Sequence, residues 1–231
     1  MKEVSRITYR LSQGGVPISE YVSQFDEDFR IIAKEDVPMD WTKLDNFQCA
    51  NCPYSLQEKK HCPVAVSISE ILFDVDNGVS TERVLCEVET PERDYKGVLD
   101  YQKAISSLIG LRMAASGCSR FDFLRPMARM HLPFASLEET IVRNGAMFLF
   151  GGSFSDSDVT IASRLDQLKD KFRELIEVNQ ALINRVRSTL KRGDIHRNAM
   201  IVLSSFSQVL SMEEQRGNHL VKRIFKEHRS D

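Results

Sequence analysis

Apolar and polar residues alternate near the start of the chain, over 5–11 and 21–25, and again over 29–32. This two-residue period is typical of strands with one buried face. Between the first two runs, Gly14 and Gly15 tolerate the positive φ that a tight hairpin needs. The pattern predicts a small antiparallel meander. A further strand is predicted over 84–90, with a partner strand over 95–98 after the turn at 91–94.

Most of the chain from Pro63 onward repeats apolar residues every three or four positions, the period of an amphipathic helix. We expect helices over 63–75, 101–115, 119–129, 136–150 and 158–192, with further helices beginning at Asp194 and Ser211. Asp100 is a candidate N-cap, and Ser136 with Glu139 has the pattern of a capping box. The short connections favour antiparallel neighbours in a bundle.

The predicted helix over 158–192 has a heptad-like seam. Two interpretations stay open: packing within the chain, or a coiled coil in a homodimer. The seam consists of Ile161, Leu165, Leu168, Phe172, Leu175, Asn179, Leu182 and Val186.

Together these patterns predict an α+β fold, with an N-terminal antiparallel sheet, a cysteine-rich metal loop and a C-terminal antiparallel helical bundle. We expect a small β-rich domain at 1–99, containing the cysteine loop and one helix, and a helical domain at 100–231. The predicted metal site bridges the two.

Composition narrows the function classes. Of 231 residues, 31 are basic and 33 acidic, and the net charge of −2 gives no footprint for nucleic-acid binding. No apolar run reaches the roughly 18 to 20 residues that span a bilayer, and residues 1–6 lack the apolar part of a secretory signal. We therefore expect a cytoplasmic protein, in a compartment that keeps its five cysteines reduced.

Three of those cysteines fall within fourteen positions, in the spacing C-x2-C-x9-C: Cys49, Cys52 and Cys62. A C-x2-C turn lets two thiolates approach one cation without backbone strain. Cys62 precedes the predicted helix at 63–75, whose macrodipole favours a thiolate. Cys118 follows a helix-ending glycine far downstream, and it completes a four-sulfur set if the fold returns it to the loop. Cys86 alternates with apolar residues on a predicted strand and is interpreted as a core residue.

Thiolate ligands suit Zn²⁺, and they suit an iron–sulfur cluster as an alternative. His61 is an alternative ligand, and His131 a more remote one. Two other interpretations stay open: a thiol switch, in which Cys62 reacts and Cys49 or Cys52 resolves it, and unmetallated thiols that pack near one another.

The sequence carries no G-x-S-x-G, no phosphate-binding glycine loop and no H-E-x-x-H, so a non-enzymatic role is favoured. Arg125 and Arg129 lie four residues apart on a predicted helix, followed by His131. They are candidates for binding an anion, or for coupling the metal to the helical half; internal ion pairs are the structural alternative.

Several motifs are distinctive: Cys-Ala-Asn-Cys-Pro-Tyr from Cys49, His-Cys-Pro-Val-Ala from His61, Ser-Gly-Cys ending at Cys118, and Leu-Arg-Pro-Met-Ala-Arg-Met-His-Leu-Pro-Phe-Ala from Leu124. In these motifs the chain resembles an uncharacterised family of bacterial proteins, over most of its length. The resemblance implies a bacterial, cytosolic setting and no reaction. It groups the same four thiols and leaves Cys86 outside.

The resulting hypothesis is a non-enzymatic metal-binding protein with a structural or a metal- or redox-sensing site, and a helical half that binds an unknown protein partner. The alternatives are an iron–sulfur or thiol redox protein, and a helical adaptor in which the metal is purely structural.

Overall fold

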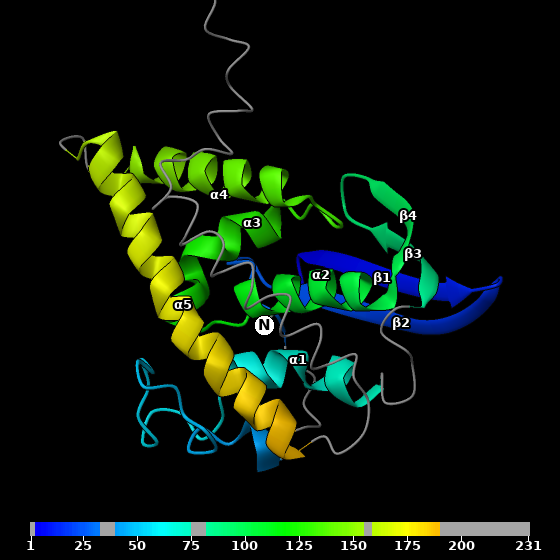
Figure 1. Ribbon diagram of the computed structural model, residues 1–231, viewed down its shortest axis with the longest axis horizontal. Coiled ribbons are helices and arrows are strands. Elements are labelled where there is room, and N and C mark those ends of the chain that lie inside the picture. Colours follow the sequence, from blue (N-terminus) through cyan, green and yellow to red (C-terminus); the bar gives the residue numbers. More distant parts are fainter. Residues whose placement is uncertain (1–2, 33–39, 75–81, 155–158, 190–231) are drawn as a thin grey trace, which may run out of the picture.

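The computed structural model describes residues 3–32, 40–74, 82–154 and 159–189 (Figure 1). It confirms the α+β prediction, because an antiparallel sheet is combined with helices that dominate the second half of the chain. The elements in chain order are β1 Ser5–Gln13, β2 Val16–Phe25, the 3₁₀-helix η1 Asp40–Thr42, α1 Pro63–Asp74, β3 Arg83–Glu89, β4 Asp94–Asp100, α2 Tyr101–Ala114, the 3₁₀-helix η2 Ser119–Leu124, α3 Arg125–Arg129, α4 Leu137–Gly152 and α5 Ile161–Thr189.

The sheet has the strand order β2-β1-β3-β4, with every neighbouring pair antiparallel. The predicted third strand of the N-terminal meander, at 29–32, is wrong: only one isolated bridge joins Phe25 to Ile31. The Asp26 carboxylate accepts hydrogen bonds from the backbone N–H groups of Asp28 and Arg30, which closes a tight turn. The second edge of β1 pairs with β3, so the sheet is completed by residues far along the chain.

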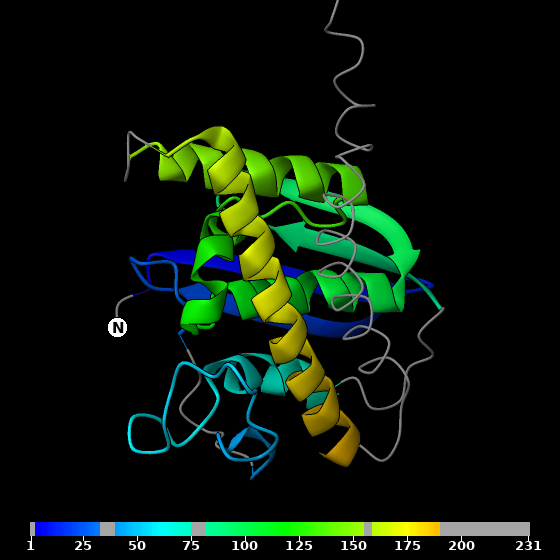
Figure 2. The ribbon, with the colours of Figure 1, turned by 60° about the vertical axis from the view of Figure 1, so that its left-hand side comes forward.

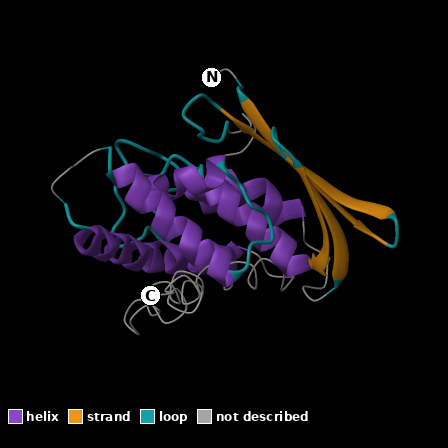
Figure 3. Cartoon of the chain, turned by 90° about the horizontal axis from the view of Figure 1, so that it is seen from above, coloured by secondary structure: helices purple, strands orange, loops and turns teal. Residues whose placement is uncertain are grey.

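One face of the sheet is buried and the other is charged. Ile7, Tyr9 and Leu11 of β1 are at most 2% exposed, because they alternate onto the face that the helices cover. The opposite face carries ion pairs, including the one between Arg10 and Glu20. Figure 3 shows the helices gathered on a single side of the strands. Cys86 is fully buried on the helix-facing side, as predicted.

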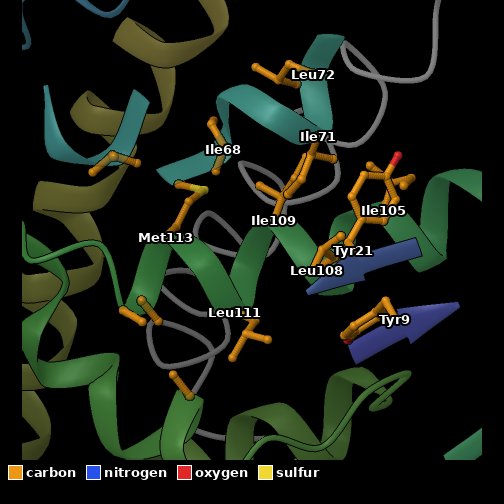
Figure 4. Packing of buried hydrophobic residues seen from close by; sticks show 14 of the residues in the cluster. Tyr9, Tyr21, Ile68, Ile71, Leu72, Ile105, Leu108, Ile109, Leu111 and Met113 are labelled. Atoms are coloured by element: carbon orange, nitrogen blue, oxygen red, sulfur yellow. The ribbon is translucent and has the colours of Figure 1, made fainter. Parts of the chain in front are cut away.

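Helix α2 lies at the centre of the core, between the sheet and α1. Ile109 and Met113 face Ile68 and Ile71 of α1, while Leu111 points to the opposite side (Figure 4). The buried apolar residues form one cluster, with members on both sides of the expected domain boundary at residue 100. The division into two domains stays a prediction.

The helix-boundary signals were accurate where a side chain was free to act as a cap. The Ser136 side chain accepts a hydrogen bond from the backbone of Glu139, whose carboxylate bonds back to the Ser136 amide, so the capping box is confirmed. Asp100 occupies the N-cap position of α2 but makes no capping bond; its carboxylate pairs with Arg83 instead. The single helix expected over 119–129 is divided into η2 and α3, and Pro126 lies in the first turn of α3, where no N–H is needed.

The seam of α5 packs within the chain. Six of its eight predicted members are at most 5% exposed: Leu168, Phe172, Leu175, Asn179, Leu182 and Val186. Ile161, at the start of the helix, is 68% exposed and does not belong to the buried seam. Figure 2 shows α5 running across the other helices from α4 towards α1. The helices predicted from Asp194 and Ser211 lie outside the described residues. Among the helices that the structure describes, none combines the length and apolarity of a membrane span.

Candidate functional site

The cysteine loop, residues 45–62, is closed at its base by backbone hydrogen bonds. The Leu44 N–H donates to the Lys60 carbonyl at 2.9 Å, and the Cys62 N–H donates to the Thr42 carbonyl at 2.8 Å. Within the loop, the Cys52 N–H donates to the Cys49 carbonyl at 3.0 Å, which folds the C-x2-C segment into a turn. Because α1 begins at Pro63, Cys62 precedes its first turn as predicted, and its carbonyl accepts from the Val66 N–H.

Side chains fasten the loop to the segment that follows α2. The Tyr54 hydroxyl donates to the Gly117 carbonyl at 2.9 Å, and Arg120 Nε donates to the Asn51 carbonyl at 2.9 Å. Gly117 adopts a φ of +78°, which turns the chain after α2. Cys118 lies between the two attached residues Gly117 and Arg120. The fold therefore returns this distant cysteine to the loop.

Helix α5 also contacts the cysteine loop and the segment after α2. The Asn51 amide donates to the Glu174 carbonyl at 2.9 Å, and the Arg120 guanidinium donates to the Glu174 carboxylate at 2.8 Å. In Figures 1 and 2 the loop lies beside α1, at the end of the molecule away from α4.

The electrostatics of the thiols reflect their proximity. The pKa of Cys49 is raised to about 12, chiefly by burial and also by the neighbouring thiols of Cys52, Cys62 and Cys118. Burial also raises the pKa of Cys118, to about 11; the Arg120 backbone N–H opposes that effect, while Cys62 and Cys52 reinforce it. Charge repulsion falls with distance, so these mutual effects belong to groups that are close together. Four thiols from separate parts of the chain are thus neighbours.

Neighbouring thiols are not yet a coordination shell. Across the described ranges, no group of three or more His, Cys, Asp or Glu side chains has an arrangement that could hold a metal ion. Convergence of the four sulfur atoms on one ion stays a prediction. Cys86 is separate from the group, on β3, where burial raises its pKa to about 12.

The two candidate histidine ligands each make a side-chain hydrogen bond. His61 Nδ1 is 2.8 Å from Thr42 Oγ1. His131 Nε2 is 2.5 Å from the Tyr9 hydroxyl, which also hydrogen-bonds to Ser107 at 2.8 Å. His131 is therefore part of the contact between the sheet and α2.

The candidate cluster of Arg125, Arg129 and His131 is not brought together as one anion site in the described structure. Arg125 pairs with Asp122 on η2 at 3.6 Å, and Arg129 is exposed at the end of α3. Only His131 of the three lines the cavity between the helices. A role for these residues in coupling to the thiols stays a prediction.

Residues that position the candidate site escaped the sequence analysis. Tyr54 and Arg120 lie inside recognised cysteine motifs or next to them, but only their carbonyl partners reveal what they do. Arg185 is 2% exposed and donates to the carbonyls of Trp41, Lys43 and Leu44, just before the loop. Its place three residues after the buried Leu182 was a usable signal, because the spacing puts it on the apolar face of α5.

His131 gives the fold an acid-sensitive contact. Burial, with a smaller effect of Arg143, lowers the pKa of His131 from 6.5 to about 3. Below pH 6.5 the unfolded chain therefore binds a proton at His131 that the folded chain does not bind. The contribution of neutral His131 to the unfolding free energy is fully present above pH 6.5 and is lost as the pH falls towards 3. In metal-free protein we expect the unfolding free energy from urea titrations to fall by about 2 kcal/mol more between pH 7 and pH 5 than in His131→Gln. Equal losses in both proteins would contradict this.

Comparisons with known proteins give a family but no activity. Neither the curated proteins nor the solved structures include a match to the chain. The family model of a domain of unknown function, DUF6901, matches residues 7–226, which is nearly the whole chain. The chain belongs to this family, DUF6901.

Proposed function

We propose that the protein is a non-enzymatic metal-binding protein in which Cys49, Cys52, Cys62 and Cys118 hold one Zn²⁺ ion. The observation that carries this proposal is the attachment of the loop to the segment around Cys118, through Tyr54 to Gly117 and Arg120 to Asn51. The cysteine loop and the segment after α2 are joined, so that Cys118 lies near thiols that precede it by more than fifty positions. Zn²⁺ accepts four thiolates in closed structural sites, and an iron–sulfur cluster is the alternative occupant.

Direct reactivity of Cys49 or Cys118 is the weaker explanation of the cluster. A reactive cysteine needs a lowered pKa, whereas burial raises the pKa of both Cys49 and Cys118. A bound cation reverses this, because it favours the deprotonated sulfur directly. Because the described residues contain no group arranged to hold an ion, binding requires the side chains to rearrange, for example by rotation between staggered χ1 wells.

The bound ion would connect the cysteine loop, the N-terminus of α1 and the segment after α2. Such a link is structural in its simplest form, because metal binding adds to the free energy of folding. It becomes a metal or redox sensor if loss of the ion releases the loop. The proposal includes a cytoplasmic setting, where the five cysteines, all unpaired in the structure, stay reduced.

Elemental analysis of full-length protein, purified anaerobically without chelator, tests this proposal. We expect about one zinc atom per chain and no visible absorption. Iron with inorganic sulfide and a brown colour would instead identify the cluster. Protein that contains neither, and that gains no metal when titrated with Zn²⁺ or reconstituted with iron and sulfide, would overturn the proposal.

A second candidate function, protein binding by the helical half, has its own observation. Phe150, Phe154 and Ile161, near the junction of α4 and α5, are 69%, 77% and 68% exposed, and the first two rings pack edge to face. Exposed apolar side chains that gather in one place mark interaction surfaces.

Self-association through these residues is testable. Sedimentation of the full chain at several concentrations should detect a dimer, and Phe154→Asp should shift it to monomer because a charge is introduced at the contact. The exposed substitution Arg187→Met is the control, and it should leave the dimer unchanged. A strict monomer at every concentration would reject the homodimer.

A further inference from the structure

The structure contains a cavity that is separate from the cysteine cluster. It lies between α2, α3, α4 and α5 and has a volume of about 420 Å³. That size falls in the range of small-molecule sites, roughly 300–1,000 Å³. Figure 1 shows α3 between α2 and α4, and residues of all three helices line the cavity.

The wall formed by α2 changes character along its length. Its cavity-lining residues are polar up to Ser107 and, from Gly110 onward, lack polar side chains. From Lys103 to Ala114 this wall extends roughly 16 Å at 1.5 Å per helical residue. The apolar end continues into Phe121 of η2 and Leu175 of α5. The cavity therefore has a polar end and an apolar end.

The polar end is positively charged. Lys103 of α2 and Arg143 of α4 both line the cavity, and both lower the pKa of Glu139 on α4. The other charged side chain in the lining is Asp100, and it pairs with Arg83 outside the cavity. Burial lowers the pKa of Arg143, and Tyr95 and Glu139 oppose that effect; one guanidinium nitrogen also donates to the Met130 carbonyl.

We propose that this cavity binds a small amphipathic carboxylate, with its head group at Lys103 and Arg143 and its apolar body between α2, η2 and α5. Lys103 and Arg143 are the cations of the lining and Asp100 is paired with Arg83, so a singly charged head group would share these two cations with Glu139. Arg143 offers the planar donor geometry that suits a carboxylate. The apolar end supplies affinity through burial, and the charged end supplies orientation.

Titration calorimetry with decanoate, below its micelle concentration, tests this inference on the full-length protein. We expect one saturable site with a Kd of about 100 µM or tighter. Decanol, which lacks the charge, should bind at least tenfold more weakly. Lys103→Met should weaken decanoate at least tenfold and leave decanol unchanged, because Lys103 is exposed and only its charge is removed. The control Arg187→Met should bind like the wild type.

A variant that fills the apolar end checks the location of the site. Met127→Trp places a larger side chain in the lining and should abolish binding of both probes, while circular dichroism reports whether it folds. If Met127→Trp fails to fold, the Lys103→Met comparison still decides the question. Absence of saturable binding, equal binding of decanol and decanoate, or binding only to phosphatidylglycerol vesicles would overturn the proposal. The cavity does not include Cys118, so Cys118→Ser is expected to bind decanoate as the wild type does. Failure of decanoate binding would therefore leave the metal proposal untouched, and loss of metal would leave the cavity proposal untouched.

Discussion

Cys118→Ser is expected to reduce the zinc content of the purified protein from about one atom per chain to near zero. A serine hydroxyl stays protonated near neutral pH and is a poor ligand for Zn²⁺, and three thiolates remain where four are needed for a closed tetrahedral site. Elemental analysis measures the loss directly. A competition titration with a chromogenic chelator should give an affinity at least about a hundredfold weaker.

Cys86→Ala is the matched control for this variant. Cys86 is fully buried on β3 and lies outside the group of thiols that influence Cys49. Its replacement removes a sulfur from the core and costs some stability, but the zinc content should not change. Unchanged metal in Cys118→Ser, or equal loss in Cys86→Ala, would remove Cys118 from the ligand set.

Arg185→Met is expected to lower the unfolding free energy by about 3 kcal/mol, because two buried hydrogen bonds and one partly buried hydrogen bond to backbone carbonyls lose their charged donor. Arg185 Nη1 donates to the carbonyls of Trp41 and Lys43, at 3.2 and 2.5 Å, and Nη2 donates to that of Leu44 at 2.9 Å. Methionine has a similar length and no donor, so the substitution tests the hydrogen bonds rather than the packing. Urea unfolding measured at pH 7 gives the difference.

Arg187→Met on the same helix is the control, since Arg187 is exposed. Its unfolding free energy should stay within about 0.5 kcal/mol of the wild type. A loss below 1 kcal/mol for Arg185→Met would show that water replaces the guanidinium at these carbonyls. Arg185→Met should also weaken zinc binding, because Arg185 holds the backbone at residues 41–44, directly before the cysteine loop.

Local signals in the sequence were sufficient for many elements. The capping box at Ser136, the strands β1 and β3, and the apolar face of α5 all depend on residues near one another in the chain, and each was predicted. Two predictions failed for different reasons. Asp100 pairs with the distant Arg83 and makes no capping bond, and the run at 29–32 follows the turn at Asp26 and makes one isolated bridge to β2.

The candidate site divides in the same way. The spacing of Cys49, Cys52 and Cys62 identified three thiols from the sequence, because a C-x2-C turn and a helix start are local structures. The return of Cys118 to them depended on hydrogen bonds from Tyr54 and Arg120 to backbone carbonyls across the fold. Such bonds leave no pattern in the sequence, because their acceptors are backbone carbonyls and every residue has one.

The sequence by itself therefore determined the strands, most helices, the apolar faces they bury and the identity of the thiols. Only the tertiary structure decided the strand order, the internal use of the α5 seam, the neighbourhood of the four thiols and the cavity between α2 and α5. The physical reason is range: propensity, period and capping act within a few residues, whereas buried hydrogen bonds and packed cavities depend on groups that meet only after the chain has folded.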